Sequence, residues 1–254
     1  MLAVISPSKN LNESPVRLTG KYTYPRFINE SAIIVEKLKT LSPARLQKLM
    51  NINRKLAELN FQRYQEWSPE FTEQNADRAI LMFSGEVYNG LQAKTLKEED
   101  LLYAQERVRI LSGLYGILRP LDLMQPYRLE MATSIVVNRK KDLYRFWGDR
   151  ITRALYEDMD GHKEKVLINL ASDEYFNSID SKKPGLRIIK CQFKEERNGR
   201  LQFITIFGKK ARGLMLRFMI ENRLENPDDL KAFDTEGYYF NSHYSTEDMW
   251  MFTR

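Results

Sequence analysis

The sequence is poor in the side chains that bind metals or form disulfides. It has one cysteine, Cys191, and two histidines, His162 and His243. A single cysteine excludes an intramolecular disulfide and a cysteine-rich zinc site. Neither histidine has a second ligand at metal-binding spacing, and Cys191 lies in an apolar strand pattern typical of a structural thiol. We therefore expect no resident metal and no cofactor.

Long hydrophobic runs are also missing. No stretch of about 18 consecutive apolar residues occurs, so we expect no membrane-spanning helix. The first ten residues, MLAVISPSKN, lack the basic segment and the long apolar segment of a secretory signal. Together these features predict a cytoplasmic protein with no membrane partner.

Repeats, low-complexity tracts and linkers are absent as well, so we expect one domain over residues 1–254, acting as a monomer. The hydrophobic fraction of 43% and the charged fraction of 29% are typical of a globular chain. The net charge of +6 and the sequence pI near 9.2 permit a polyanionic partner without establishing one.

Strand-like runs alternate with amphipathic helical runs along the chain, which predicts a mixed α/β (α+β) fold: a mixed β-sheet core wrapped by helices. The expected strands are Leu2–Ile5, 79–83, 108–111, 165–170, 186–193 and 201–207, with an edge strand from the tail at 238–240 and 249–252. Asn198-Gly199 predicts a hairpin turn between the strands 186–193 and 201–207. The expected helices are 25–41, a pair within 42–67, 97–107, 141–159 and 209–224.

Residues 109–131 have a composition typical of a segment that lines a functional site. Gly113 and Gly116 interrupt the apolar strand, as glycines do where two backbones approach closely. The loop that follows concentrates aromatic and charged residues, among them Tyr127, Arg128 and Glu130. The alternative interpretation is a buried strand followed by a loop pinned by its own ion pairs.

Residues 42–67 have the pattern of a tight helical pair. Leu46, Leu49 and Ala57 fall at the spacing of a helix-hairpin-helix DNA-binding motif, with Asn51-Ile52-Asn53 where that motif has Gly-apolar-Gly. Asparagine reaches the left-handed conformation readily, so the turn remains feasible. Such a turn presents backbone N–H groups to a phosphate at the start of the second helix, beside the basic residues Lys48, Arg54 and Lys55. The alternative is an ordinary helical hairpin with a solvated basic face.

A second basic cluster, Lys209-Lys210-Ala211-Arg212-Gly213, lies at the expected start of the helix 209–224. Cations in a first helical turn oppose the helix dipole, which favours a role in binding an anion. We expect a single positive cleft formed by Lys9, Arg119, Arg128, Lys209, Lys210 and Arg212. In the alternative, Arg128 pairs with Glu130 or Asp122 and the lysines are solvated.

Several stretches resemble the YaaA family of bacterial peroxide-stress proteins along nearly the whole chain. They are ISPSKNL, FSGEVYNGLQA, LSGLYGILRPLDLMQPYRLEM, LYRFWGD, INLASDEYF, KKARGLMLRFMIENRL and EGYYF. The resemblance implies a cytoplasmic protein that protects against hydrogen peroxide, with lower free iron and less oxidative DNA damage. It also implies a single-domain mixed α/β fold and DNA binding through a helix-hairpin-helix element and a positive cleft. It carries over no catalytic residues.

Three functions remain open at this point. The first is a non-enzymatic DNA-binding protein that contacts phosphates and prefers branched or distorted DNA to a given sequence. The second is an enzyme acting on a small anionic substrate around Arg128 and Glu130, although no catalytic motif supports it. The third is an iron-handling protein that uses carboxylates such as Asp122 and Glu130.

Overall fold

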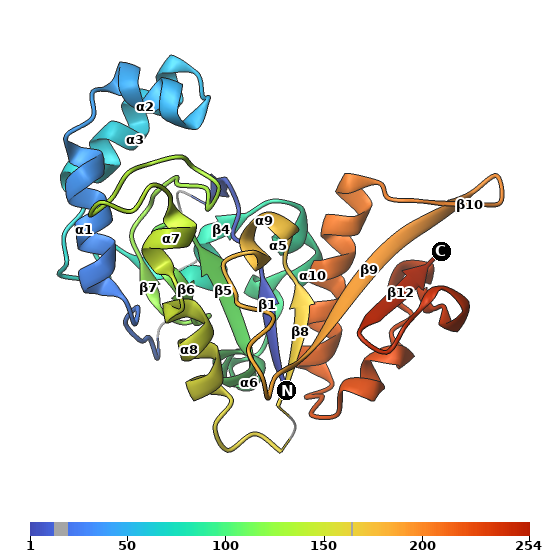
Figure 1. The fold of residues 1–254 in the computed structure, drawn as a ribbon. Coiled ribbons are helices and arrows are strands. Elements are labelled where there is room, and N and C mark those ends of the chain that lie inside the picture. The colour runs from blue at the N-terminus through green and yellow to red at the C-terminus, as the bar shows by residue number, and fades with distance from the viewer. Residues whose placement is uncertain (13–19, 164) are drawn as a thin grey trace.

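The core of the molecule is a mixed eight-stranded sheet, seen in a computed structural model that describes residues 1–12, 20–163 and 165–254. Along the sheet the strands run β11-β12-β9-β8-β1-β5-β6, and β10 pairs with β9 (Figure 1). Their bounds are β1 (Leu2–Ile5), β5 (Val108–Ser112), β6 (Gly116–Leu118), β8 (Val166–Leu170), β9 (Arg187–Arg197), β10 (Arg200–Gln202), β11 (Tyr239–Phe240) and β12 (Met249–Thr253).

The middle of the sheet is parallel. β1 pairs in parallel with β5 on one side and with β8 on the other, with Ile5 opposite Ile110 and Leu170. β8, β9 and β12 continue in parallel, whereas β6 and β11 pair antiparallel at the two edges. Every residue of β1, β5 and β8 is buried, as expected for parallel strands covered on both faces. The carboxyl ends of these three strands therefore lie at the same edge of the core.

Helices surround this sheet (Figure 1). α6 packs against β1 and β5, and α10 packs against β9, α5 and α6. The helices are α1 (Ile28–Lys39), α2 (Pro43–Met50), α3 (Arg54–Glu66), α4 (Ala79–Met82), α5 (Glu86–Leu91), α6 (Glu98–Arg107), α7 (Leu143–Trp147), α8 (Arg150–Asp158), α9 (Asp173–Phe176) and α10 (Thr205–Glu221). Short 3₁₀ turns are η1 (Ala93–Thr95), η2 (Pro227–Ala232), η3 (Thr235–Gly237) and η4 (Ser242–Tyr244).

Two small ladders brace the loops outside the main sheet. β2 (Asn10–Leu11) pairs with β4 (Phe83–Ser84), and β3 (Asp77–Arg78) pairs with β7 (Leu123–Met124). Within the part of the chain that the structure describes, no helix is long and apolar enough to cross a bilayer.

The predicted mixed α/β fold is confirmed, and so is the hairpin at Asn198-Gly199. Asn198 and Gly199 both have positive φ, 51° and 70°, between the paired residues Arg197 and Arg200. The second strand of this hairpin ends at Gln202, and α10 begins at Thr205. The basic cluster at 209–213 therefore lies in the second and third turns of α10 and not at its start.

Two other predicted elements were wrong. The apolar run 79–83 is not a strand, because Ala79–Met82 forms a buried helical turn between β3 and β4. Apolar runs this short do not distinguish a buried strand from a buried helix. The predicted helix 141–159 is two helices, α7 and α8, separated at Gly148, whose φ of 53° is outside the helical range.

Candidate functional site: a cleft at the carboxyl ends of β1 and β8

A cavity of about 590 Å³ opens beyond the carboxyl ends of β1 and β8. These strands are neighbours, but the chain leaving β1 leads to β5 on one side, whereas the chain leaving β8 leads to β9 on the other. Such a switch point is where open parallel sheets place their ligands. The lining is Ser6, Pro7, Ser8, Lys9, Asn10, Gly85, Glu86, Val87, Tyr88, Arg128, Ser172, Glu174, Tyr175, Lys209 and Arg212.

Two serines join the strand ends beneath this cleft. The Ser172 backbone N–H donates to Ser6 Oγ at 2.8 Å, and the two serine hydroxyl oxygens lie 3.1 Å apart. Tyr88, on α5, donates its hydroxyl to the Ser6 carbonyl oxygen at 3.1 Å. These contacts hold the ends of β1, β8 and α5 in register around the cleft.

A close helix crossing sets the position of the α10 wall. A Cβ added at Gly213 would lie 1.8 Å from the Val87 carbonyl oxygen, and one added at Gly90 would lie 2.2 Å from the Lys210 carbonyl oxygen. Only glycine allows α5 and α10 to approach so closely. The crossing therefore places Lys209 and Arg212, on α10, in the same cleft lining as the first residues of α5.

Glu130 holds two of the predicted cleft cations together. Its carboxylate pairs with Lys9 Nζ and with Arg128 Nη2, each at 3.1 Å. Arg128 Nε and Glu130 Oε2 are buried, and neither has a hydrogen-bond partner among the residues that the structure describes. The alternative in which Arg128 pairs with Glu130 is thus correct, yet Arg128 still lines the cleft together with Lys9.

The other two cleft cations, Lys209 and Arg212, are unpaired. Neither side chain makes an ion pair or hydrogen bond with any residue that the structure describes. Burial lowers the pKa of the Arg212 guanidinium, an effect that the nearby carboxylate of Asp173 opposes. Asp173 itself pairs with Lys190 at 2.7 Å. Arg212 therefore carries a partly desolvated positive charge with no direct counterion.

Lys210 and Arg119 do not join the predicted cleft. Lys210 is next to Lys209 but pairs with Glu236 at 2.5 Å, and this contact lowers the pKa of the Glu236 carboxyl. Arg119 pairs with Asp122 at 3.1 Å. Neither residue is part of the cleft lining. The structure thus brings together Lys9, Arg128, Lys209 and Arg212 from the predicted set.

Two carboxylates of the cleft also lack a cationic partner among the described residues. Glu86 Oε1 accepts from Asn89 Nδ2 at 3.2 Å, and Glu174 Oε1 accepts from the Ala132 N–H at 3.3 Å. Sequence reasoning missed Glu86 and the serines Ser6 and Ser172 as site residues. The two serines could have been found from their position in the sequence. Ser6 comes one residue after β1, and Ser172 comes two residues after β8.

The predicted helical pair is present as α2 and α3, at the end of the molecule towards which β1 and β5 point (Figure 1). Asn51 is left-handed, with φ 49° and ψ 55°, and Asn53 caps α3 by accepting from the Leu56 N–H at 2.9 Å. Lys48, Arg54 and Lys55 are exposed, and Arg54 pairs with Glu58 at 2.7 Å. Asn51 thus supplies the left-handed residue of the turn, and Asn53, whose backbone is extended, supplies the N-cap of α3.

The hairpin and the cleft are connected through α3. Tyr64, which is buried, donates its hydroxyl to the Arg128 carbonyl oxygen. Lys48, Asn51, Asn53, Arg54 and Lys55 are not part of the cleft lining, so the predicted site residues form two separate surfaces.

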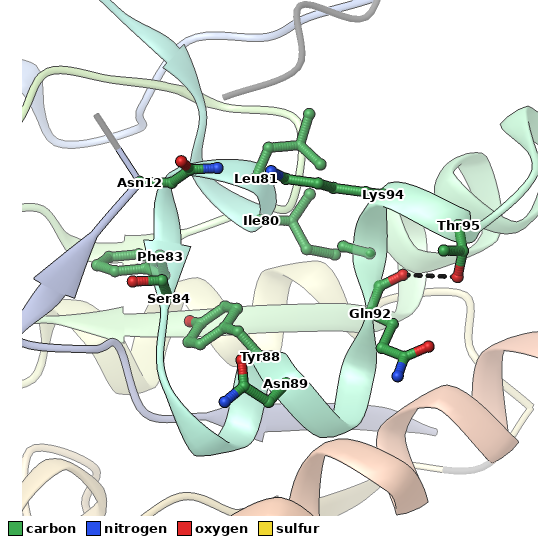
Figure 2. Close-up of a pocket in the computed structure, with 11 residues that line it drawn as sticks. Asn12, Ile80, Leu81, Phe83, Ser84, Tyr88, Asn89, Gln92, Lys94 and Thr95 are labelled. Atoms are coloured by element: carbon green, nitrogen blue, oxygen red, sulfur yellow. Dashed lines mark hydrogen bonds between the residues drawn. The ribbon is translucent and has the colours of Figure 1, made fainter. Parts of the chain in front are cut away.

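A second cavity, of about 630 Å³, shares Tyr88 with the first and differs from it in chemistry (Figure 2). Its lining is mainly apolar and amide, and Lys94 is its one cation among the described residues. Figure 2 shows Lys94 and Gln92 beside this cavity, with the Thr95 hydroxyl donating to the Gln92 carbonyl oxygen at 2.9 Å. It has no concentration of charge like that of the first cleft.

The family model described as "Peroxide stress protein YaaA" matches residues 1–244 of the chain. The chain belongs to this family. It is therefore a peroxide stress protein, as the resemblance in its sequence implied.

Five of the stretches that carry the resemblance to the YaaA family supply the lining of the cleft. ISPSKNL contributes Ser6 to Asn10, FSGEVYNGLQA contributes Gly85 to Tyr88, LSGLYGILRPLDLMQPYRLEM contributes Arg128, INLASDEYF contributes Ser172, Glu174 and Tyr175, and KKARGLMLRFMIENRL contributes Lys209 and Arg212. Segments far apart in the sequence thus meet at one place. Asp122, which the iron-handling hypothesis used with Glu130, lies elsewhere and is held by Thr23 and Arg119.

Proposed function

We propose that this peroxide stress protein binds DNA without sequence preference, through phosphate contacts at the turn between α2 and α3. The observation that carries the proposal is the turn itself. It combines a left-handed Asn51, the solvent-exposed start of the 13-residue helix α3 and three exposed cations. A helix N-terminus attracts a phosphate through its free N–H groups and its dipole.

The local charge supports the same function. Residues 42–67 carry five basic side chains against two acidic ones. The ion pair between Arg54 and Glu58 is exposed on both sides, so it contributes little to stability and a phosphate can replace it. Because such contacts read the backbone, we expect a preference for shape, such as a branch or a distortion, over a base sequence. In this proposal the protein acts in the cytoplasm as a monomer and lowers oxidative damage to DNA.

The hairpin is a better place for DNA than the interior of the cleft. A cavity of about 590 Å³ has the size of a small-molecule site. The hairpin lies at one end of the molecule (Figure 1) and its cations are exposed, so a duplex can reach them without rearrangement. The phosphate backbone of branched DNA is accessible in the same way.

The test is DNA binding by the double variant Arg54→Glu, Lys55→Glu at several salt concentrations, on linear and four-way junction DNA. We expect weaker binding and a salt slope that falls by about one unit for each lost phosphate contact. The charge-matched control is Arg153→Glu, Lys165→Glu, which reverses two other exposed cations far from the hairpin in the sequence. Equal affinity and equal slope in the two double variants would show that DNA does not bind at the hairpin.

A further inference from the structure

The switch-point cleft contains charges of both signs that have no partner of opposite sign within residues 1–12, 20–163 and 165–254. Lys209 and Arg212, on α10, are cations of the lining without an ion pair, and Glu86 on α5 and Glu174 on α9 are carboxylates of the same lining without a cation among the described residues. Unpaired ionic groups facing one cavity are costly unless a ligand or water satisfies them. A ligand that satisfies all four has an anionic group at one end and hydrogen-bond donors at the other.

The cationic wall has the geometry to hold a single oxyanion. Lys209 and Arg212 are three residues apart on α10, so their side chains leave neighbouring positions on one face of the helix. Lys210 lies about 100° further round the helix, which explains why it reaches Glu236 and not the cleft. Arginine forks and lysine ammonium groups are the usual partners of phosphate oxygens.

The floor and the acidic wall supply the remaining contacts. The hydroxyls of Ser6 and Ser172 face the cleft and can each donate or accept. Carboxylates at the carboxyl end of a parallel sheet commonly accept hydrogen bonds from sugar hydroxyls, as the acidic residue of dinucleotide-binding folds does. Glu86 on α5 and Glu174 on α9 line the same cavity and can do this.

We infer that the cleft binds a phosphorylated sugar or a nucleotide, with its phosphate on Lys209 and Arg212 and its sugar hydroxyls on Glu86 and Glu174. The cavity volume of about 590 Å³ is large enough for a nucleoside monophosphate. This site is separate from the hairpin proposed to bind DNA, so each proposal can be tested independently of the other.

The test is calorimetric titration of the full-length protein with AMP, ribose 5-phosphate, adenosine and inorganic phosphate. We expect ribose 5-phosphate, AMP or both to bind more tightly than inorganic phosphate, and adenosine to bind more weakly than AMP. A preference for AMP over ribose 5-phosphate identifies a nucleotide site, and the reverse identifies a sugar-phosphate site. If adenosine binds as tightly as AMP, or if neither phosphorylated sugar binds better than inorganic phosphate, the inference is wrong.

Variants then place the ligand in the cleft. Lys209→Gln and Arg212→Gln should each weaken binding of the phosphorylated probe roughly 10- to 100-fold, the range for loss of one charge-assisted hydrogen bond. Lys210→Gln is the matched control, because it removes the neighbouring charge on the same helix without touching the cleft lining. Lys209 is exposed, so its variant keeps the test decisive even if Arg212→Gln does not fold.

Two further outcomes bear on the assignment. Glu86→Gln should weaken ribose 5-phosphate binding several-fold and leave the weaker binding of inorganic phosphate unchanged. The hairpin variant Arg54→Glu, Lys55→Glu should bind the phosphorylated probe as the wild type does, whatever its DNA affinity. Equal loss of probe binding in Lys209→Gln and Lys210→Gln would mean that general positive charge, and not the cleft, binds the probe.

Discussion

Gly213→Ala gives a sharp test of how the cleft is built. The new methyl group would lie 1.8 Å from the Val87 carbonyl oxygen and 2.8 Å from the Leu91 backbone nitrogen, both in α5. Backbone atoms cannot move aside as a side chain can, so α5 and α10 must separate. Overpacking of this kind costs about 1–3 kcal/mol, and alanine recovers up to about 1 kcal/mol through its higher helix propensity. We expect a net loss of roughly 1–2 kcal/mol in the free energy of unfolding.

Gly208→Ala is the matched control on the same helix. Its Cβ would meet the ring of Phe203 at 2.3 Å, but that side chain is 51% exposed and free to rotate away. We expect Gly208→Ala to be neutral or slightly stabilising, because it gains helix propensity without moving a backbone. Urea unfolding of both variants, with the slope checked for constancy, measures the difference. If Gly213→Ala is as stable as Gly208→Ala, the close crossing of α5 and α10 does not set the cleft wall.

Three more expectations concern other parts of the molecule. The pKa of His162 is lowered to about 4 from an ordinary 6.5, chiefly by burial and then by Arg107 and the N-terminus. The unfolded chain therefore binds a proton that the folded chain does not, so this contribution to stability is lost as pH falls from about 6.5 to about 4. His162→Gln should remove this pH-dependent contribution, so the urea midpoint of the variant should change less between pH 6.5 and pH 4 than that of the wild type. Equal changes of the midpoint in the two proteins would contradict this. Asn51→Ala should cost about 1 kcal/mol because Asn51 has φ 49°, and Asn51→Gly should cost little, as thermal melting of the two variants would show. Burial raises the pKa of Cys191 to about 12, so iodoacetamide should alkylate it only after unfolding; rapid alkylation of the native protein would refute its burial.

Local sequence signals predicted much of the fold. Largely apolar runs identified β1, β5 and β8, because strands buried on both faces are rich in apolar residues; the buried polar exceptions are Arg109 and Ser112 in β5 and Asn169 in β8. Ser42 followed by Pro43 marked the start of α2, and Asn51 and Asn53 marked the turn to α3, because each of these residues satisfies a backbone requirement of its own position. The short run 79–83 was misassigned because strand and buried helix have the same composition at that length.

The cleft, in contrast, depends on contacts that no local signal contains. Five separate segments meet there because β1 and β8 are parallel neighbours whose connections leave in opposite directions. The sequence alone marked Lys209, Lys210 and Arg212 as equivalent cations. The tertiary structure separated them, since the helical turn and the position of Glu236 direct Lys210 away from the cleft and leave Lys209 and Arg212 facing it.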